Sequence, residues 1–150
     1  MEVIIFCGIQ ASGKTTFYKD FFLKSHIRIS LDQLRTRNKE EKFIQLCLSF
    51  NQSFVVDNTN PTINDRGKYI NVAKEHKCKI ICYYFKSKLN DSLERNKKRI
   101  GKENIPEIGV RGTFNKLEIP SFKEGFDELY YVEINENSFT IKEWHNEEIL

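Results

Sequence analysis

One eight-residue stretch near the N-terminus restricts the fold of this chain more than any other feature. Residues 8–15 read GIQASGKT and match the pattern G-x-x-x-x-G-K-[ST]. The apolar run VIIFC precedes the stretch, and a helix-like run begins at its end. Its glycines let the backbone curl so that successive N–H groups point inward, where an anion can accept their hydrogen bonds. We therefore expect a strand, a phosphate-binding loop and a helix, in that order.

The loop supplies candidate contacts to the phosphates of a nucleotide. Lys14 is placed to reach the β- and γ-phosphates, and the Thr15 hydroxyl to hold Mg²⁺. The helix N-terminus adds the positive end of its dipole. The pattern alone does not separate a kinase from an ATPase or a GTPase switch. The residues expected at the nucleotide are Gly8, Ala11, Ser12, Gly13, Lys14, Thr15 and Thr16.

Short β-branched and aromatic runs alternate with longer helix-like stretches along the chain. This alternation predicts right-handed βαβ crossovers and an α/β fold with a mainly parallel sheet of about five strands, covered by helices on both faces. The expected strands are Val3–Cys7, Ile27–Ile29, Phe54–Asp57, Lys79–Phe85 and Glu128–Ile134. The expected helices are Lys14–Lys24, Asp32–Phe50, Ile63–His76, Leu89–Arg99 and Ile105–Leu117.

The 150 residues contain no repeat and no Pro/Gly-rich linker, so we expect one domain over residues 1–150. Residues 138–150 begin like an extra edge strand and end in a polar tail. Lys and Arg number 24 against 21 Asp and Glu, a small excess that says nothing about partners by itself.

Cysteine use and the N-terminal run both favour the cytoplasm. The cysteines lie in apolar runs without a CxxC pair, which favours buried free thiols in a reducing compartment. The N-terminal run carries Glu2 and lacks a basic flank, which is typical of a buried strand and not of a signal peptide. No apolar run approaches the ~20 residues that span a bilayer, so we expect no membrane partner. The cysteines are Cys7, Cys47, Cys78 and Cys82.

Two features favour a kinase among nucleotide-binding proteins. A guanine-specific switch would carry an N-K-x-D element, which is absent, and a motor or AAA-type ATPase would need a longer chain. A kinase also needs a carboxylate to take the hydroxyl proton and positive charge around the transferred phosphoryl group. Candidates for both stand after predicted strands, at the sheet edge where open α/β sheets bind ligands.

Asp32 and Arg35 follow the second predicted strand in the run ISLDQLR. If this segment is helical, their spacing puts both side chains on one face. A surface ion pair is one interpretation, and spacing alone favours it. The other is a general base beside an arginine that grips a substrate phosphate.

Asp57 ends the third predicted strand in the run VVDNTNP. A carboxylate in this place resembles a Walker-B acid, which supports Mg²⁺ directly or through water. An Asp that initiates a turn before Pro61 is the alternative. Both interpretations stay open.

The densest positive charge is the run RNKKR at residues 95–99. Arg95 and Arg99 are four residues apart and share one helical face. The run is either a solvated face or a lid whose arginine closes over the γ-phosphate.

In this order, these elements resemble the polynucleotide 5′-hydroxyl kinase family, particularly the kinase half of phage and animal polynucleotide kinase-phosphatases. The resemblance runs from Met1 to about Ile134. Beyond the generic phosphate-binding loop, its motifs are Asp32-x-x-Arg35, Asp57-Asn58-Thr59-Asn60, Arg95-Asn96-x-Lys98-Arg99, Ile105-Pro106 with Arg111, and Pro120-x-x-x-Glu124-Gly125-Phe126.

The resemblance implies transfer of the ATP γ-phosphate to the 5′-OH end of DNA or RNA, with Mg²⁺ and a basic helical lid. It implies Asp32 as the base, Arg35 on the phosphate 3′ of the acceptor nucleotide, and Arg99 on the donor phosphates with Arg95 as companion. The implied catalytic set is Lys14, Asp32 and Arg99. The implied substrate set is Asp32, Arg35, Asp57, Asn58 and Arg111, and the implied metal set is Thr15 and Asp57.

The chain departs from the familiar members of that family in one respect. The phosphatase signature D-x-D-G-[TS] is absent, so we expect no 3′-phosphatase activity and regard a separate phosphatase or ligase as a candidate partner. A small-molecule kinase of the same fold is the alternative function. A nucleotide-gated binding module, in which Asp32 is a spectator, is the non-enzymatic one.

Overall fold

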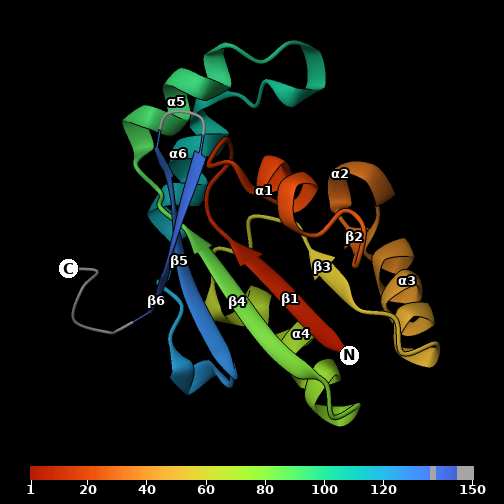
Figure 1. Ribbon diagram of the computed structural model, residues 1–150. Coiled ribbons are helices and arrows are strands. Elements are labelled where there is room, and N and C mark those ends of the chain that lie inside the picture. Colours follow the sequence, from red (N-terminus) through yellow and green to blue (C-terminus); the bar gives the residue numbers. More distant parts are fainter. Residues whose placement is uncertain (136–137, 145–150) are drawn as a thin grey trace.

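The centre of the molecule is a six-stranded sheet in the order β2-β3-β1-β4-β5-β6. The computed structural model describes residues 1–135 and 138–144. Strands β1 to β5 run parallel, and β6 pairs with β5 in the antiparallel direction (Figure 1). The strands are β1 (Glu2–Cys7), β2 (Ile27–Ile29), β3 (Phe54–Val56), β4 (Lys79–Phe85), β5 (Glu128–Asn135) and β6 (Ser138–Glu143).

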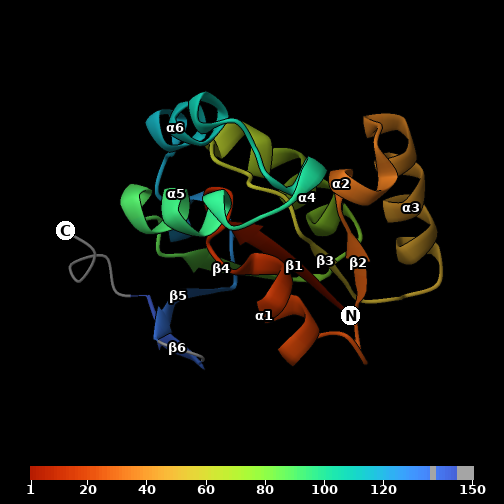
Figure 2. The same cartoon turned by 90° about the horizontal axis from the view of Figure 1, so that it is seen from above.

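Helices cover both faces of this sheet. Viewed from above, α1 lies on one side and α4 and α6 lie on the other (Figure 2). The helices are α1 (Lys14–Phe21), α2 (Leu31–Leu34), α3 (Arg37–Ser49), α4 (Ile63–Glu75), α5 (Leu89–Lys97) and α6 (Glu107–Lys116), with short 3₁₀ turns η1 (Gly101–Glu103) and η2 (Phe122–Glu124).

Strand β1 is apolar without interruption because both of its faces are buried. Ile4 and Phe6 belong to a cluster with Phe17 of α1, on one side of the sheet. Val3 and Ile5 belong to the cluster that α3 and α4 complete on the other side. Continuous apolar runs are typical of parallel strands covered on both faces. The predicted α/β fold, with a mainly parallel sheet between helices, is confirmed.

The helix predicted over Asp32–Phe50 is wrong in one respect, because the structure divides it into α2 and α3. Arg35 follows α2 with φ of 74°, a backbone conformation that continues no helix. Helix α3 then restarts at Thr36, whose side chain accepts a hydrogen bond from the Lys39 amide. The shared helical face predicted for Asp32 and Arg35 is therefore absent.

The extra strand predicted after residue 138 is present as β6, at the edge of the sheet. The buried Trp144 follows it, and its ring lies edge-on against Tyr84 at 5.4 Å between centroids. This aromatic contact ties the end of β6 to the sheet. The tail predicted beyond it falls on residues 145–150, which lie outside the described residues. The predicted free thiols are present, since all four cysteines are buried and unpaired.

A buried ion pair connects α4 to η2, just before β5. The side chain of Arg66 is fully buried, and its Nε and Nη2 donate to the two carboxylate oxygens of Glu124 at 2.8 and 3.1 Å. Nη1 also donates to the Asn60 carbonyl, just after β3, at 2.9 Å. Arg66 thus connects three segments: α4, the end of β3 and the glutamate of the predicted closing motif.

Removing one partner of this pair leaves a buried charge without compensation. Replacing Arg66 by Met should lower the free energy of unfolding by about 3 kcal/mol, measured by urea denaturation. The matched control is Lys79→Met, which breaks the exposed Lys79–Glu128 pair and should change the free energy of unfolding far less, because solvent screens that pair. Equal losses in the two variants would contradict the structural role of the buried pair.

Candidate active site

The predicted phosphate-binding loop lies between β1 and α1 and is fixed to the end of β3. The Gly8 amide donates to the Thr59 carbonyl at 3.0 Å. Ala11 and Gly13 have φ of 58° and 93°, so the chain passes twice through the left-handed region. A Cβ at Gly13 would stand 2.6 Å from the side chain of Ile134, on β5. The loop is therefore compact and held from both sides.

Lys14 is folded back into this loop. Its ammonium donates to the carbonyls of Gly8 at 2.9 Å and Ile9 at 2.7 Å, and its side chain is buried. Burial lowers the pKa of Lys14 to about 8, against the opposing effect of Asp57. The charges of Arg99 and Asp32 also act on this ammonium. The loop thus holds a desolvated cation where an anion could replace the carbonyls as its partner.

Thr15 and Asp57 bring two oxygen atoms together beside the loop. Thr15 Oγ1 donates to Asp57 Oδ2 at 3.1 Å, and the Asp57 side chain is 2% exposed. Hydroxyl and carboxylate oxygens suit Mg²⁺, which usually keeps several waters and phosphate oxygens as further ligands. The described residues contain no group of three or more His, Cys, Asp or Glu that could hold a metal alone. The pair fits a metal that arrives with a nucleotide.

Arg28, on β2, contacts the same two oxygens and was missed from the sequence. Its Nε donates to Asp57 Oδ2 at 2.8 Å, and its Nη2 donates to Thr15 Oγ1 at 3.3 Å. In the sequence, Arg28 is one polar residue between two isoleucines in a short strand. Only the pairing of β2 with β3 brings it beside Asp57.

Asp32 stands in the first turn of α2, and its side chain is exposed. Ser30 caps this helix by accepting the Asp32 amide at 3.3 Å. Arg35 is also exposed, and no hydrogen bond or ion pair joins it to Asp32 in the described residues. The surface ion pair that the spacing alone favoured is therefore absent.

Asn58 bonds to the first residue of α2 and to α3. Its Oδ1 accepts the Leu31 amide at 2.9 Å, and its Nδ2 donates to Glu40 Oε2 at 2.9 Å. Glu40 is buried on α3 and also accepts from the Tyr69 hydroxyl at 2.9 Å. Asn58 therefore has internal partners on both sides of its amide. Sequence reasoning missed Glu40 and Tyr69, because a glutamate among lysines reads as solvent-facing.

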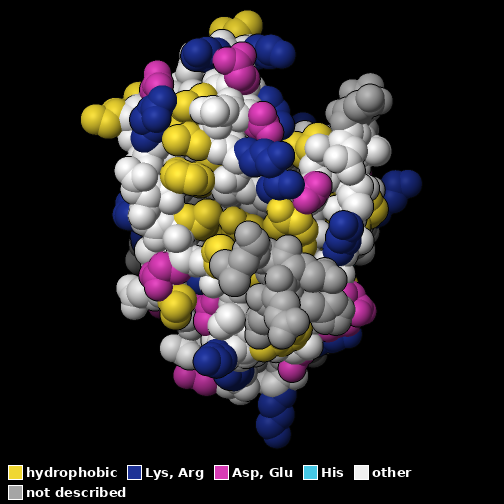
Figure 3. Space-filling model, turned by 90° about the vertical axis from the view of Figure 1, so that its left-hand side faces the viewer, with side chains coloured by type: hydrophobic (Ala, Val, Ile, Leu, Met, Phe, Trp, Pro, Cys, Tyr) yellow, Lys and Arg dark blue, Asp and Glu magenta, His cyan; other side chains and the backbone are white. Residues whose placement is uncertain are grey.

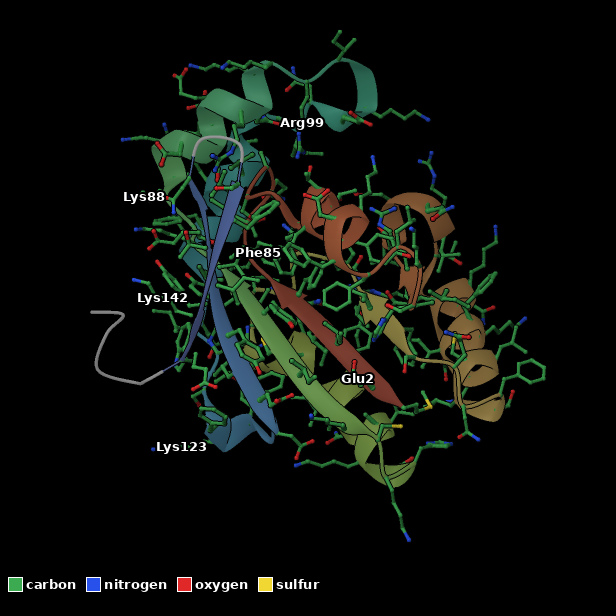
Figure 4. The ribbon with its side chains drawn as sticks, viewed as in Figure 1. Glu2, Phe85, Lys88, Arg99, Lys123 and Lys142 are labelled. Atoms are coloured by element: carbon green, nitrogen blue, oxygen red, sulfur yellow. The ribbon has the colours of Figure 1, made fainter. Side chains whose placement is uncertain are left out.

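Residues 89–116, here called the lid segment, extend over the loop. Arg95 Nε donates to the Ala11 carbonyl at 2.7 Å. Figure 4 shows Arg99 between the lid segment and the start of α1. Arg111 instead forms an exposed pair with Glu107 at 2.8 Å within α6.

The outer surface of the lid segment carries mixed charge. Figure 3 shows Lys and Arg side chains near the top of this face, with Asp and Glu among them. Lys97, for example, lies 3.9 Å from Glu94 on this exposed surface. Within the basic run, Arg95 thus turns toward the loop while Lys97 faces solvent.

A shallow, open cleft of about 90 Å³ adjoins the loop on the β5 side. It combines positive and negative side chains, and Arg95 connects it to the loop. Lys88 stands at this side of the molecule (Figure 4). The residues lining the cleft are Lys86, Lys88, Asp91, Arg95, Glu133, Ile134 and Asn135.

Comparison with known proteins assigns the family. A family model described as an AAA domain matches residues 3–118. The chain belongs to this family. The choice among nucleotide-binding activities rests on the relatives and on the site.

Curated relatives of the chain are kinases by name. The chain is 30% identical over 129 residues to the bifunctional polynucleotide phosphatase/kinase of Schizosaccharomyces pombe, a match covering 83% of this chain and 32% of that protein. It is 28% identical over 144 residues to the L-seryl-tRNA(Sec) kinase of Methanococcus maripaludis, covering 83% of this chain and 56% of that protein. The chain thus spans about a third and just over half of these relatives. The resemblance to polynucleotide kinases is confirmed.

A solved structure shows the same fold. The gluconokinase of Sinorhizobium meliloti superposes with a TM-score of 0.59 at 17% identity, covering 88% of this chain and 82% of that one. The fold is that of the P-loop kinases. None of the helices in residues 1–135 and 138–144 is long and apolar enough to cross a membrane.

The lowered pKa of Lys14 predicts proton uptake when a nucleotide binds. At pH 8 about half of the free protein should carry a neutral Lys14, and bound phosphate should restore the ammonium by raising its pKa. Calorimetry of ADP binding in buffers of different ionisation enthalpy should therefore detect uptake of about half a proton at this pH, and less uptake as the pH is lowered and Lys14 is already protonated.

Replacing Lys14 by Arg provides the control, because a guanidinium stays protonated throughout this range. Uptake should disappear in this variant. Equal uptake in both proteins, or uptake that does not change with pH, would contradict the assignment of the shifted pKa to Lys14.

Proposed function

We propose that this chain transfers the γ-phosphate of ATP to the 5′-hydroxyl end of DNA or RNA. The observation that carries the proposal is the convergence of charges on Lys14. Asp57 after β3, Asp32 on α2 and Arg99 of the lid segment all act on its ammonium, although they come from three separate segments. A phosphate-binding cation that interacts with carboxylates and with an arginine suits phosphoryl transfer.

On the donor side, Lys14 and the amides of the loop would bind the β- and γ-phosphates. Thr15 and Asp57 would hold Mg²⁺, which neutralises charge on the phosphates when bound. Arg95 and Arg99 would face the donor from the lid segment.

On the acceptor side, Asp32 would accept the proton of the 5′-hydroxyl. The hydroxyl oxygen would at the same time bond to the γ-phosphorus, and ADP would depart with the electrons of the broken P–O bond. Arg35 would bind the phosphate on the 3′ side of the acceptor nucleotide. Asn58 would act indirectly, because it holds the first amide of the helix that carries Asp32. Arg111, paired with Glu107, would need to leave that partner to reach a substrate.

The polynucleotide acceptor is supported by the phosphatase/kinase relative and by the exposure of Asp32 and Arg35. A general base on the surface can reach the 5′ end of a nucleic acid without a pocket that encloses the whole substrate. A small-molecule kinase is the second candidate, favoured by the fold of a gluconokinase, and it would need an enclosed pocket at Asp32. We further propose that the chain works in the cytoplasm, alongside a separate phosphatase or ligase.

The direct test is transfer of labelled γ-phosphate from ATP to 5′-hydroxyl oligonucleotides, with DNA and RNA side by side. Asp32→Asn should lower kcat by about a hundredfold or more, because the general base is lost while ATP binding remains. Lys14→Ala should abolish transfer and weaken ATP binding. Asp20→Asn, an exposed carboxylate on α1, is the matched control and should leave the rate unchanged.

Three outcomes separate the candidate functions. Transfer that both Lys14→Ala and Asp32→Asn remove supports the proposed kinase. No transfer to any oligonucleotide, with ATP binding intact, would contradict a polynucleotide acceptor and favour a small hydroxyl compound. Transfer that survives in Asp32→Asn would remove Asp32 from the chemistry.

The proposed contact of Arg35 with a substrate phosphate predicts a selective defect. Arg35→Gln should raise the KM for the oligonucleotide by about tenfold, because a charged hydrogen bond is lost, and leave the KM for ATP unchanged. The salt dependence of oligonucleotide binding should also weaken, since one phosphate contact fewer is made. A rise in the KM for ATP instead would move Arg35 to the donor side.

A further inference from the structure

Arg28 is the residue of this site that neither the motifs nor the proposed function accounts for. It lies on β2, paired with Val55 of β3, two residues before Asp57. The guanidinium bridges Asp57 Oδ2 at 2.8 Å and Thr15 Oγ1 at 3.3 Å. Its backbone is fixed by the sheet, while its side chain remains 21% exposed, so the guanidinium has a path into solvent.

The contacts of Arg28 coincide with those expected of the metal. Asp57 Oδ2 accepts both Arg28 and the Thr15 hydroxyl. A bound Mg²⁺ needs lone pairs of these same oxygens and would repel a guanidinium at hydrogen-bonding distance from them. Two cations therefore compete for one buried carboxylate.

A buried carboxylate without a counter-charge destabilises a fold. Asp57 is almost fully buried, so it needs a cation whether or not a metal is present. Lys14 is close enough to interact with Asp57 through space, yet its hydrogen bonds go to the carbonyls of Gly8 and Ile9 and to Ser12. Arg28 is the cation that bonds directly to Asp57.

We propose that Arg28 is a positioning residue that takes the place of the divalent cation on Asp57 and Thr15, and that the incoming metal–nucleotide complex displaces it. Arg28 holds the two metal ligands together before binding and lowers the affinity of the site for the metal. This inference rests on the proposed donor site, in which Thr15 and Asp57 hold the metal.

The test measures the binding of Mn²⁺ to the full chain saturated with ADP. Electron paramagnetic resonance gives the concentration of the free ion. Neutralising the competitor in Arg28→Gln should tighten Mn²⁺ binding by about fivefold or more, because a unit charge leaves the immediate surroundings of the site. Arg28→Lys keeps the charge but loses the forked geometry, so its Mn²⁺ affinity should lie between those of Arg28→Gln and the unchanged protein.

Thermal unfolding gives a second readout. Without metal, Arg28→Gln should have a lower Tm than the unchanged protein, since Asp57 is left unpaired. Addition of Mn²⁺ and ADP should raise the Tm of this variant by more than that of the unchanged protein, because the metal then supplies the missing cation. Arg37→Gln is the matched control: it also removes an arginine from a buried carboxylate, Glu40, and should leave Mn²⁺ affinity unchanged.

The outcomes distinguish failure of this inference from failure of the donor site. Unchanged or weaker Mn²⁺ binding in both Arg28 variants would overturn the competition. If Arg28→Gln does not fold, Arg28→Lys decides by the same criterion. If the unchanged protein binds ADP but no Mn²⁺, the proposed metal site fails and this inference fails with it. Tighter binding in Arg37→Gln as well would show a general charge effect and would also overturn it.

Discussion

The buried carboxylate of Asp57 is the constraint on which the rest of the site depends. It sits one residue beyond β3, where the backbone of β2 still pairs with it through the Ile29 carbonyl at 2.8 Å. From there it bonds to the phosphate-binding loop through Thr15 and to β2 through Arg28. Because a charge in this position must be compensated, the three segments hold a common geometry.

In the absence of a nucleotide, charged side chains of the site bond to partners within the protein. Lys14 is bonded to carbonyls of its own loop, Asp57 to Arg28, and Arg95 to the Ala11 carbonyl. Each of these partners is one that a triphosphate and a metal would replace. Nucleotide binding would therefore exchange these internal hydrogen bonds for bonds to the ligand.

Sequence patterns predicted those features that depend on neighbouring residues. The loop at residues 8–15 and the strand before it were predictable because glycine spacing and apolar runs act locally. The break at Arg35 was not predictable from the sequence. Helix α3 begins after the N-cap Thr36, and the sequence lacks the acidic partner that would complete a capping box and mark a helix start. Arg28 and Glu40 were missed because their partners come from other segments, through sheet pairing and helix packing.

A crystal structure with Mg²⁺ and a non-hydrolysable ATP analogue tests the central claim most directly. The account predicts phosphates inside the loop, with the Lys14 ammonium moved from the Gly8 and Ile9 carbonyls to phosphate oxygens. It also predicts that the metal lies beside the Thr15 hydroxyl and the Asp57 carboxylate. Phosphates bound elsewhere, or a Lys14 still bonded to its own loop beside a bound nucleotide, would contradict it.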